Sequence, residues 1–451
     1  MTNPLLPALL ISGFASAACA ESFQMPPLSE MREAAASLPA PNAAPPDAKP
    51  RKWTLMFYFN GKNDVESYAL KDMNKLEEAG SSAEVAVTSE LGRSGWPGVD
   101  SPDEKWAGAR RYLVHRDSDT ARIGSPPLEA FPQTDMGDWR HLAGFVRWAK
   151  SNFPAEHYML LVWDHGWGWL DPKNPTLGYR SISHDFDNGS YVKTAELKQM
   201  LESAGGVDVF ATMACFMQMA EIDWELKKHA RVIVGSEEVI QLPSFDFAAI
   251  VRRLEAEPDA GPERLGEIFV DSFKELYSRP DMLDMLEKTK YGVQLSAVRA
   301  DRVAGLKPLL DKWAELTPSG GNKALSAARE GVLRMELGDE KSDPDKSISS
   351  YADLGNFMEI YAAALPPQAA ELRELSLGIS GYVSNELVIK NTGFCKDRTG
   401  KDYSRARGLA INIPGRPGTL LEAANKYSDL DFARQTGWGG FVSGLAPAPA
   451  R

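Results

Sequence analysis

The strongest constraint on the fold is a set of short apolar runs that lack the alternation of apolar and polar residues typical of half-exposed strands. Apolar residues at helical spacing separate these runs from one another. Strands that are buried on both faces and connected by amphipathic helices are typical of a parallel sheet with helices on each side. We therefore expect an α/β fold with a mostly parallel central sheet. The runs are 53–59, 85–88, 158–163, 207–212 and 231–235.

Changes in composition and pattern suggest how the 451 residues are organised. Beyond the α/β core the pattern becomes mainly helical, with one further strand expected at 291–298. Two late β-like runs, 379–389 and 408–413, are expected to extend the sheet or to form a small accessory domain. The expected divisions are a signal peptide at 1–20, a Pro/Ala-rich linker at 21–50, an α/β core at 51–250, a mainly helical region at 251–375, and a β-containing region with a tail at 376–451.

Residues 5–20 read LLPALLISGFASAACA and end in the small-residue triplet Ala18-Cys19-Ala20. This run is too short and too interrupted for a transmembrane helix, but it fits the apolar segment and cleavage site of a signal peptide. We therefore expect export to the periplasm or the exterior. An alternative use of the same residues is lipid attachment at Cys19, although Ser16 stands where bacterial lipoprotein sites usually carry Leu.

Charge and cysteine content exclude several classes of partner and fold. The chain has 50 Lys and Arg against 62 Asp and Glu, a net charge of -12, which argues against nucleic-acid binding because that needs basic patches. Cys19, Cys215 and Cys395 are too few for a disulfide framework or a zinc ribbon. The histidines other than His165 show no zinc-binding spacing, so no metal site is expected from them.

Two of the expected strands lead into residues that carry nucleophilic chemistry. The run 158–163 leads into the triplet DHG, which contains His165, and the run 207–212 leads into MAC, which ends in Cys215. Because the carboxyl ends of parallel strands meet at one edge of a sheet, His165 and Cys215 are expected to lie together there. A thiol paired with an imidazole provides a nucleophile and a proton shuttle for acyl transfer.

The surroundings of this pair fit the same chemistry. Cys215 is expected to open a helix, whose N-terminal N–H groups would favour the thiolate. Backbone N–H groups of Gly166 and Cys215 are expected to form an oxyanion hole. His165 precedes Cys215 by 50 positions (215 − 165), close to the separation of ~50 in caspase-type peptidases.

Three interpretations in which these residues have no catalytic or metal-binding role stay open. A lone cysteine between a buried strand and an apolar helix is often a small core residue. In an exported protein, Cys215 could instead form a disulfide with Cys395. The stretch 185–189, DFDNG, offers clustered oxygen ligands, but it lacks the spacing of a calcium loop, and we expect a surface turn there.

The chain also resembles the clostripain family of cysteine peptidases, which belongs to the caspase-like clan. The opening WTLMFYFNGKNDVESYALKDMNKLEEAGSS is similar to the family's first strand and its acidic, asparagine-containing loop and helix. Four later segments are similar to further family blocks in the same order. These are LLVWDHGWGW, ISHDFDNGSYVKTAELKQML, MACFMQMAEIDWELKKHARVIVGSEE and YSDLDFARQTGWGGF.

The resemblance implies a caspase-like fold in which His165 and Cys215 form a catalytic dyad, with Gly166 beside the oxyanion site. Such enzymes cleave peptide or protein substrates through an acyl-enzyme. No cofactor is needed for that chemistry, although some members of the family depend on calcium. The family commonly cleaves after Arg or Lys and is often activated by self-cleavage between the His and Cys blocks, where Lys173 and Arg180 lie in this chain.

One departure from the family pattern concerns the specificity pocket. Family members usually carry Asp two residues before the nucleophile, whereas this chain has Met213. An apolar residue does not compensate a buried guanidinium, and breaking a buried charge pair costs roughly 3–5 kcal/mol. Glu237 or Asp246 could supply the missing charge, or the pocket could accept an apolar side chain. The expected function is an exported cysteine endopeptidase, made as a zymogen, and the alternative is an inactive secreted or lipid-anchored binding protein of the same fold.

Overall fold

The computed structural model describes residues 50–95, 105–170, 181–243, 245–317, 322–336, 348–414 and 427–445. The expected signal peptide, Cys19, almost all of the expected linker, and the loop residues Lys173 and Arg180 lie outside these ranges. Among the residues described, no helix combines the length and apolar character needed to cross a membrane.

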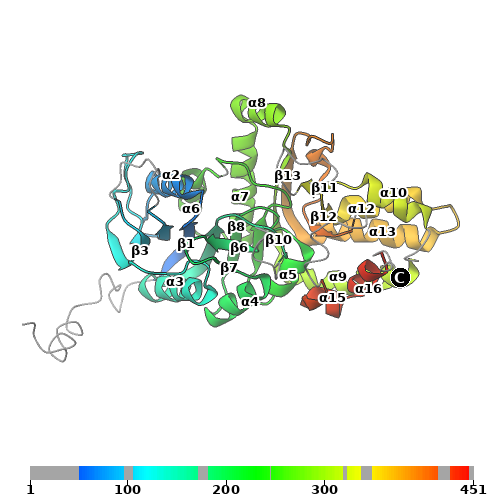
Figure 1. Cartoon of the computed structure of the whole chain (residues 1–451), viewed down its shortest axis with the longest axis horizontal. Coiled ribbons are helices and arrows are strands. Elements are labelled where there is room, and N and C mark those ends of the chain that lie inside the picture. Colours follow the sequence, from blue (N-terminus) through cyan, green and yellow to red (C-terminus); the bar gives the residue numbers. More distant parts are fainter. Residues whose placement is uncertain are drawn as a thin grey trace, which may run out of the picture. The chain divides into compact units, whose positions relative to one another are not determined.

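A nine-stranded sheet runs through the described part of the chain (Figure 1). Its strands are β1 (Arg51–Gly61), β2 (Val85–Arg93), β3 (Gly108–Leu113), β4 (Pro127–Phe131), β5 (Ala155–Trp163), β8 (Val209–Met213), β9 (Val232–Gly235), β10 (Val293–Arg299) and β13 (Val388–Phe394). Their order in space is β13-β10-β9-β8-β5-β1-β2-β3-β4. The five strands from β9 to β2 run parallel, and the two pairs at the ends join antiparallel. This arrangement confirms the expected α/β fold.

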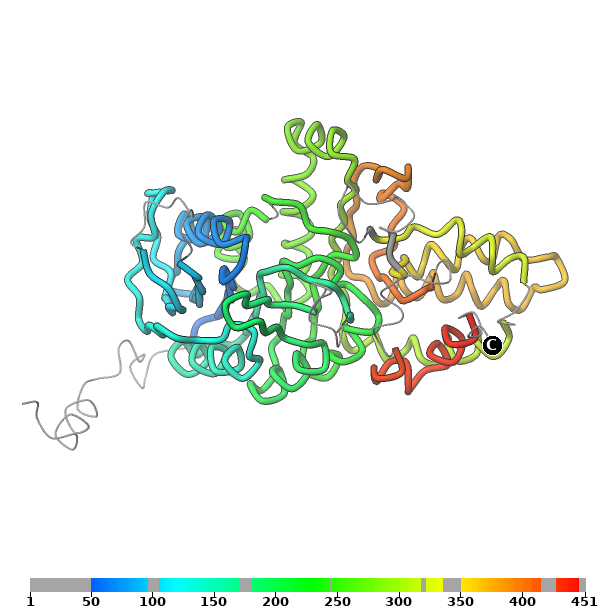
Figure 2. Tube along the Cα trace, viewed as in Figure 1, coloured from blue at the N-terminus to red at the C-terminus, as the bar shows by residue number. Residues whose placement is uncertain are grey.

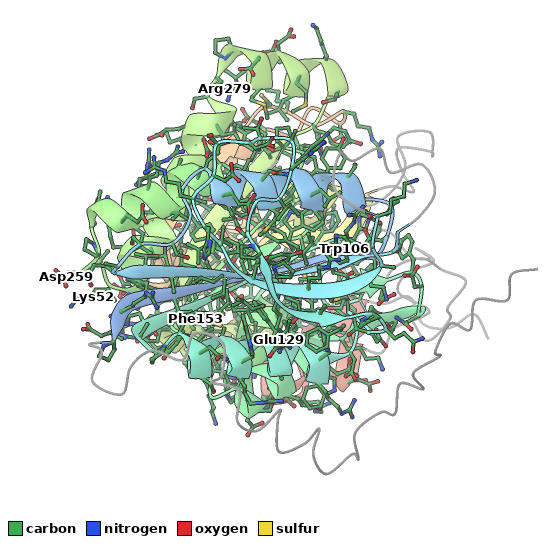
Figure 3. All side chains as sticks on the ribbon, turned by 90° about the vertical axis from the view of Figure 1, so that its left-hand side faces the viewer. Lys52, Trp106, Glu129, Phe153, Asp259 and Arg279 are labelled. Carbon is green, nitrogen blue, oxygen red and sulfur yellow. The ribbon has the colours of Figure 1, made fainter. Side chains whose placement is uncertain are left out.

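Each face of the sheet carries its own hydrophobic core, because successive side chains of a strand point to opposite faces. In β1, Trp53, Leu55 and Phe57 belong to one core, whereas Met56 and Tyr58 belong to the other, and all five are fully buried. This two-sided burial explains the continuous apolar run at the start of the core. One face is covered by α2 (Glu66–Glu77), α6 (Phe247–Ala256) and α7 (Pro262–Tyr277), the other by α3 (Trp139–Asn152), α4 (Thr194–Ser203) and α5 (Ala220–Leu226) (Figures 1 and 3).

The main sheet continues beyond the first 250 residues. Strand β10 pairs with β9, and β13 pairs with β10, so both later segments of the chain add a strand to it. The division expected at residue 250 lies inside α6. The late run at 408–413 contributes β14 (Ala410–Asn412), which joins a separate small sheet with β11 (Arg334–Glu336) and β12 (Ile348–Asp353).

The strand expected over 379–389 is wrong for most of its length. Helix α13 (Ala370–Tyr382) and a single π-helical turn, η2 (Val383–Leu387), occupy it. Ile379 and Val383 are four residues apart and are both fully buried, so they line one face of a helix rather than alternate across a strand. A short apolar run is compatible with either structure, and only the packing of the helix decided between them.

A third core joins helices from the later part of the chain, most of which lie between β10 and β13 in sequence (Figure 2). It surrounds Trp313 and Trp438, which are both fully buried and whose ring centroids are 5.6 Å apart. The contributing helices are α9 (Leu306–Leu316), α10 (Lys323–Gly331), α12 (Leu354–Ala364), α13, α15 (Asp431–Gln435) and α16 (Gly437–Leu445). Helix α8 (Pro280–Thr289) instead follows α7 and contributes to the first core.

Candidate active site

The two predicted catalytic residues leave adjacent strands at the same edge of the sheet. In β5 and β8, Trp163 lies opposite Met213, and the backbone N–H of Asp164 donates to the Met213 carbonyl across 3.2 Å. His165 and Cys215 each come two residues after this pair. The register therefore brings His165 and Cys215 to neighbouring main-chain positions at this edge, and their action as a dyad stays a prediction.

Gly166 packs directly against the backbone of Cys215. A Cβ added to Gly166 would lie 2.5 Å from the Cys215 carbonyl oxygen and 3.0 Å from the Cys215 nitrogen. Both atoms belong to the main chain, so they have little freedom to move aside. Glycine is therefore required here by close approach, and its N–H lies beside the thiol.

His165 is held by a carboxylate that the sequence did not single out. The imidazole Nε2 donates to Asp64 Oδ1 across 2.8 Å, from the loop that follows β1. Burial lowers the pKa of His165, but the bond to Asp64 and the negative charges of Asp164 and Asp64 outweigh it and raise the pKa above 6.5. The hydrogen bond to His165 in turn lowers the pKa of Asp64. Both shifts favour the imidazolium–carboxylate pair.

Asp164 fixes the loop that carries His165. One of its carboxylate oxygens accepts from the His165 backbone N–H across 2.6 Å and from Asn63 Nδ2 across 2.7 Å, and the other accepts from the His184 backbone N–H. Burial raises the pKa of Asp164 to about 7, although these donors oppose the shift. Asn63 also donates to the His184 carbonyl across 2.9 Å. The loops after β1 and β5 are thus tied together behind His165.

Cys215 is a free, partly buried thiol, and Cys395 is free as well, so the structure contains no disulfide between them. Burial raises the pKa of Cys215 to about 12, and the charge of Glu238 adds to the shift. The backbone N–H groups of Ile240, Gly166 and Cys215 act in the opposite direction, because they favour the thiolate. The two N–H groups predicted to hold an oxyanion therefore lie beside the sulfur.

The helix expected to begin at Cys215 begins later. Helix α5 starts at Ala220 with Met219 as its N-cap, and Cys215 lies in a turn in which Phe216 has a φ of 61°. The Phe216 N–H donates to the Glu238 carbonyl across 3.2 Å, which fixes this turn against the segment after β9. The expectation that a helix dipole activates the thiol is therefore wrong, because the left-handed residue directs the chain away from a helix.

The three candidate specificity residues lie in different environments. Met213 is only 4% exposed and packs in the same apolar core as Ile240. Glu237 is fully buried, and this burial, together with the nearby Asp353 carboxyl, raises its pKa well above 4.5. Asp246 is exposed, and its side chain caps α6 by accepting from the Ala249 N–H across 2.9 Å.

The stretch 185–189 forms the turn between β6 (Ile182–Asp185) and β7 (Ser190–Val192), as expected. Lys62 Nζ lies 3.0 Å from Asp185 and 3.5 Å from Asp187, so an ammonium group already occupies the space between these carboxylates. This turn does not fit a calcium ion. Elsewhere in the described ranges, no group of three or more His, Cys, Asp or Glu side chains is placed to hold a metal.

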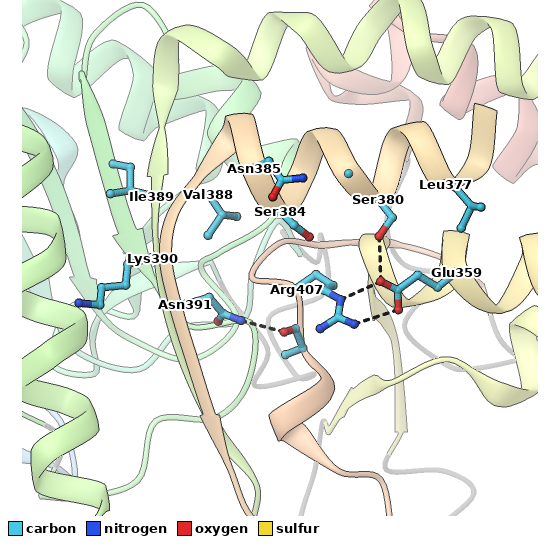
Figure 4. Close-up of a pocket in the computed structure, with 12 residues that line it drawn as sticks. Glu359, Leu377, Ser380, Ser384, Asn385, Val388, Ile389, Lys390, Asn391 and Arg407 are labelled. Carbon is cyan, nitrogen blue, oxygen red and sulfur yellow. Dashed lines mark hydrogen bonds and ion pairs between the residues drawn. The ribbon is translucent and has the colours of Figure 1, made fainter. Parts of the chain in front are cut away.

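A hollow of about 590 Å³ lies away from this edge, along α13, η2 and β13 (Figure 4). Two of its charged groups pair with each other, because Arg407 Nε lies 2.8 Å from Glu359 Oε1, and Ser380 donates to the same oxygen across 3.1 Å. Neither His165 nor Cys215 lines it. The hollow is therefore separate from the predicted catalytic pair.

Comparison with known proteins identifies the family. The sequence model of the clostripain family matches residues 57–443, which is most of the chain. The chain belongs to the clostripain family. The resemblance seen in the sequence blocks is thereby confirmed.

Individual relatives of this clostripain-family chain are distant. Clostripain from Hathewaya histolytica is 26% identical over 229 residues, which cover 46% of this chain and 43% of clostripain. The match thus spans less than half the length of that curated relative. A secreted C11 cysteine protease from Bacteroides thetaiotaomicron, solved with an irreversible peptide inhibitor, has a TM-score of 0.61 and 16% identity, covering 86% of this chain and 99% of its own.

A second solved structure, an inactive zymogen C11 protease from Parabacteroides distasonis, has a TM-score of 0.60 and 16% identity, covering 88% of this chain and 99% of its own. At such low identity these similarities speak for the fold alone. They confirm the caspase-like architecture expected for a member of the clostripain family.

Proposed function

We propose that this clostripain-family chain is an exported cysteine endopeptidase in which Cys215 is the nucleophile and His165 is the general base and acid. The observation that carries the proposal is the pairing of β5 with β8, which sets the two residues side by side with backbone N–H groups at the sulfur. The hydrogen bond to Asp64 supports it, because it orients the imidazole.

The reaction follows from these positions. His165 Nε2 is bonded to Asp64, so Nδ1 is the nitrogen that takes the proton from the Cys215 thiol as sulfur attacks the scissile carbonyl. The N–H groups of Gly166 and Cys215 hold the oxyanion of the tetrahedral intermediate. As the C–N bond breaks, the imidazolium protonates the leaving amine, and an acyl-enzyme remains on sulfur. Water, deprotonated by His165, then attacks the thioester and releases the acid and the thiol.

The thiol pKa of about 12 fits a nucleophile that is deprotonated only as substrate binds. A substrate carbonyl would occupy the N–H groups that face the sulfur in this arrangement, and His165 would act as the base for the thiol. The role of His165 is then essential rather than supportive, since the resting thiol is protonated at neutral pH.

For the residue before the scissile bond, we propose an uncharged side chain. Met213 sits in an apolar core, Asp246 is occupied as a helix cap, and burial raises the pKa of Glu237, which disfavours its charged form. None of these groups offers a counter-charge for Arg or Lys. A preference for basic residues would instead identify Glu238, which is buried beside Cys215 and accepts a hydrogen bond from the Tyr403 hydroxyl, as the compensating acid.

Export and activation rest on the sequence. The pattern at 1–20 supports export, with lipid attachment at Cys19 as the alternative. Lys173 and Arg180, between the His and Cys blocks, are the proposed sites of self-cleavage of a zymogen, and a calcium requirement stays a prediction from the family. One of the solved relatives is described as secreted and another as an inactive zymogen, which agrees with this proposal.

The second candidate is an inactive binding protein that keeps the fold. The observations in its favour are the high thiol pKa and the absence of an acid at Met213. The two candidates differ in turnover. Mature wild type and Cys215→Ala would be compared on a peptide library varied before the scissile bond, with and without calcium, with intact mass recorded for both. Cleavage by wild type alone supports the peptidase; no cleavage by folded, chain-cleaved wild type supports the binding protein.

A further inference from the structure

Phe186 is an exposed aromatic residue beside the catalytic pair. It lies in the turn between β6 and β7, and 45% of its surface is exposed. Within the described residues, the only other exposed large apolar side chains are Tyr68 at 38% and Leu377 at 49%. Binding sites are lined mainly by apolar and aromatic side chains, and this aromatic ring lies next to the proposed catalytic His165.

The turn holds Phe186 in a fixed place next to His165. The Phe186 and His165 rings are nearly parallel, at 5°, with centroids 6.5 Å apart. The Phe186 backbone N–H donates to the Lys62 carbonyl across 2.9 Å, and the Asn188 N–H donates to Asp185 Oδ1 across 2.9 Å. These bonds preorganise the turn, so little conformational freedom is lost when a ligand covers the ring.

The sheet order places Phe186 on the side of His165 that faces away from Cys215. Strand β5, which leads to His165, lies between β8, which leads to Cys215, and β1. The β6–β7 turn is joined to the end of β1, since Phe186 bonds to Lys62 and Asn60 Nδ2 donates to Ser183 Oγ across 3.2 Å. Along this edge the order is therefore Cys215, His165, Phe186.

The proposed chemistry assigns the two halves of the substrate to this line. The acyl half becomes attached to Cys215, while the leaving amine must reach His165 to be protonated. The residue after the scissile bond then continues beyond the imidazole. We propose that Phe186 binds the side chain of that residue, so that the enzyme favours substrates with an apolar or aromatic residue directly after the cleaved bond. This inference rests on the proposed function.

The charges around Phe186 add a second element of selectivity. The side chain of Asp64 is 62% exposed and that of Asp187 is 32% exposed. Asp64 bonds to His165, whose ring faces Phe186, and Asp187 directly follows Phe186 in the chain. Lys62 carries one positive charge against the two negative charges of Asp185 and Asp187, so the turn keeps a net negative charge that opposes an acidic residue at the same substrate position. Asp or Glu after the scissile bond is expected to be the poorest class.

The test uses peptides with a constant acyl half and Gly, Ala, Leu, Phe or Asp after the scissile bond. For wild type, kcat/KM is expected to be roughly tenfold higher with Leu or Phe than with Gly. Phe186→Ala should lose most of this preference, so that its kcat/KM values for the Leu, Phe and Gly peptides converge, whereas Phe186→Leu should keep part of it. Leu377→Ala, an equally exposed apolar truncation far along the chain, is the matched control and should behave as wild type.

The rate of deacylation distinguishes two roles of Phe186: binding the substrate after the scissile bond, or only supporting the His165 ring. The leaving half has departed before the acyl-enzyme is hydrolysed, so Phe186→Ala should hydrolyse a pre-formed acyl-enzyme, made from an ester with the same acyl half, at the wild-type rate. Equal losses on all peptides, or slower deacylation, would overturn the inference while the peptidase stands. If folded, chain-cleaved wild type cleaved none of the peptides, both the proposed function and this inference would be refuted.

Discussion

Asp64 Oδ1 accepts a hydrogen bond from His165 Nε2 across 2.8 Å, although the two residues are 101 positions apart. The carboxylate comes from the loop after β1 and the imidazole from the loop after β5, so adjacent parallel strands bring them together. In the proposed mechanism this bond leaves Nδ1 to accept the thiol proton, and it raises the pKa of His165 against the effect of burial.

The first prediction concerns the pH dependence of Asp64→Asn. A protonated imidazole does not accept the thiol proton, so activity rises as pH passes above the pKa of His165. Asparagine removes the charge that raises this pKa, and the acidic limb of kcat/KM should therefore move to lower pH. The rate above that limb should fall about tenfold, less than for a buried triad carboxylate, because Asp64 is largely exposed. An unchanged limb in the pH profile would contradict the role of Asp64.

The second prediction concerns the reactivity of Cys215. Because burial raises its pKa to about 12, the native thiol should react slowly with iodoacetamide at pH 7, and the rate should still be increasing above pH 9. The unfolded chain is the control, since its thiol returns to a pKa of about 8.5 and reacts readily. Mass spectrometry of the peptide that contains Cys215 gives both rates. Fast labelling of the native protein at pH 7 would point to a resting thiolate instead.

The third prediction concerns Gly166→Ala. The added methyl group would meet two backbone atoms of Cys215, at 2.5 and 3.0 Å, so the sheet edge must shift. We expect a loss of roughly 1–3 kcal/mol in the free energy of unfolding and a loss of most peptidase activity. Gly440→Ala, which meets nothing within 4 Å, is the control and should leave both unchanged. Urea unfolding and peptide turnover are the two measurements, and full activity of Gly166→Ala would exclude a close Gly166 N–H at the oxyanion.

The fourth prediction concerns Met213→Asp, which restores the acid usual in the family. The new carboxylate should allow cleavage after Arg or Lys, measured on the peptide library. It should also lower stability by roughly 3 kcal/mol in the absence of substrate, because an unpaired charge is placed in an apolar core. Met213→Leu keeps the core and serves as the control. Strong basic preference already in wild type would show that another acid, such as Glu238, serves the pocket.

The fifth prediction concerns stability and Glu237. Its pKa in the folded protein is raised above the unfolded value of 4.5 by burial and by Asp353, so folding favours the protonated form and stability falls as pH rises above about that value. Glu237→Gln removes this dependence and should make the protein more stable than wild type at pH 8, with the difference shrinking below pH 4.5. Unfolding midpoints across pH test this, and greater stability of wild type at pH 8 would contradict a neutral Glu237.

Local pattern predicted the parts of the fold whose burial is uniform along the chain. The run at 53–59 is apolar throughout because the side chains of β1 enter both cores. Its burial on both faces can therefore be predicted from the residues of the run alone. The run at 379–389 shows the limit, since Ile379 and Val383 satisfy a helix and a strand equally well until neighbouring helices bury one face.

The sequence by itself determined the parallel sheet and the position of His165 and Cys215 directly after two of its strands, because both follow from apolar runs and from what comes directly after them. Tertiary structure alone decided that Asp64 orients the imidazole, that Phe216 turns the chain away from a helix at Cys215, and that Glu237 is buried while Asp246 caps α6. The physical reason is that periodicity and strand ends are local properties, whereas these contacts depend on strand register and loop packing between residues far apart in the chain.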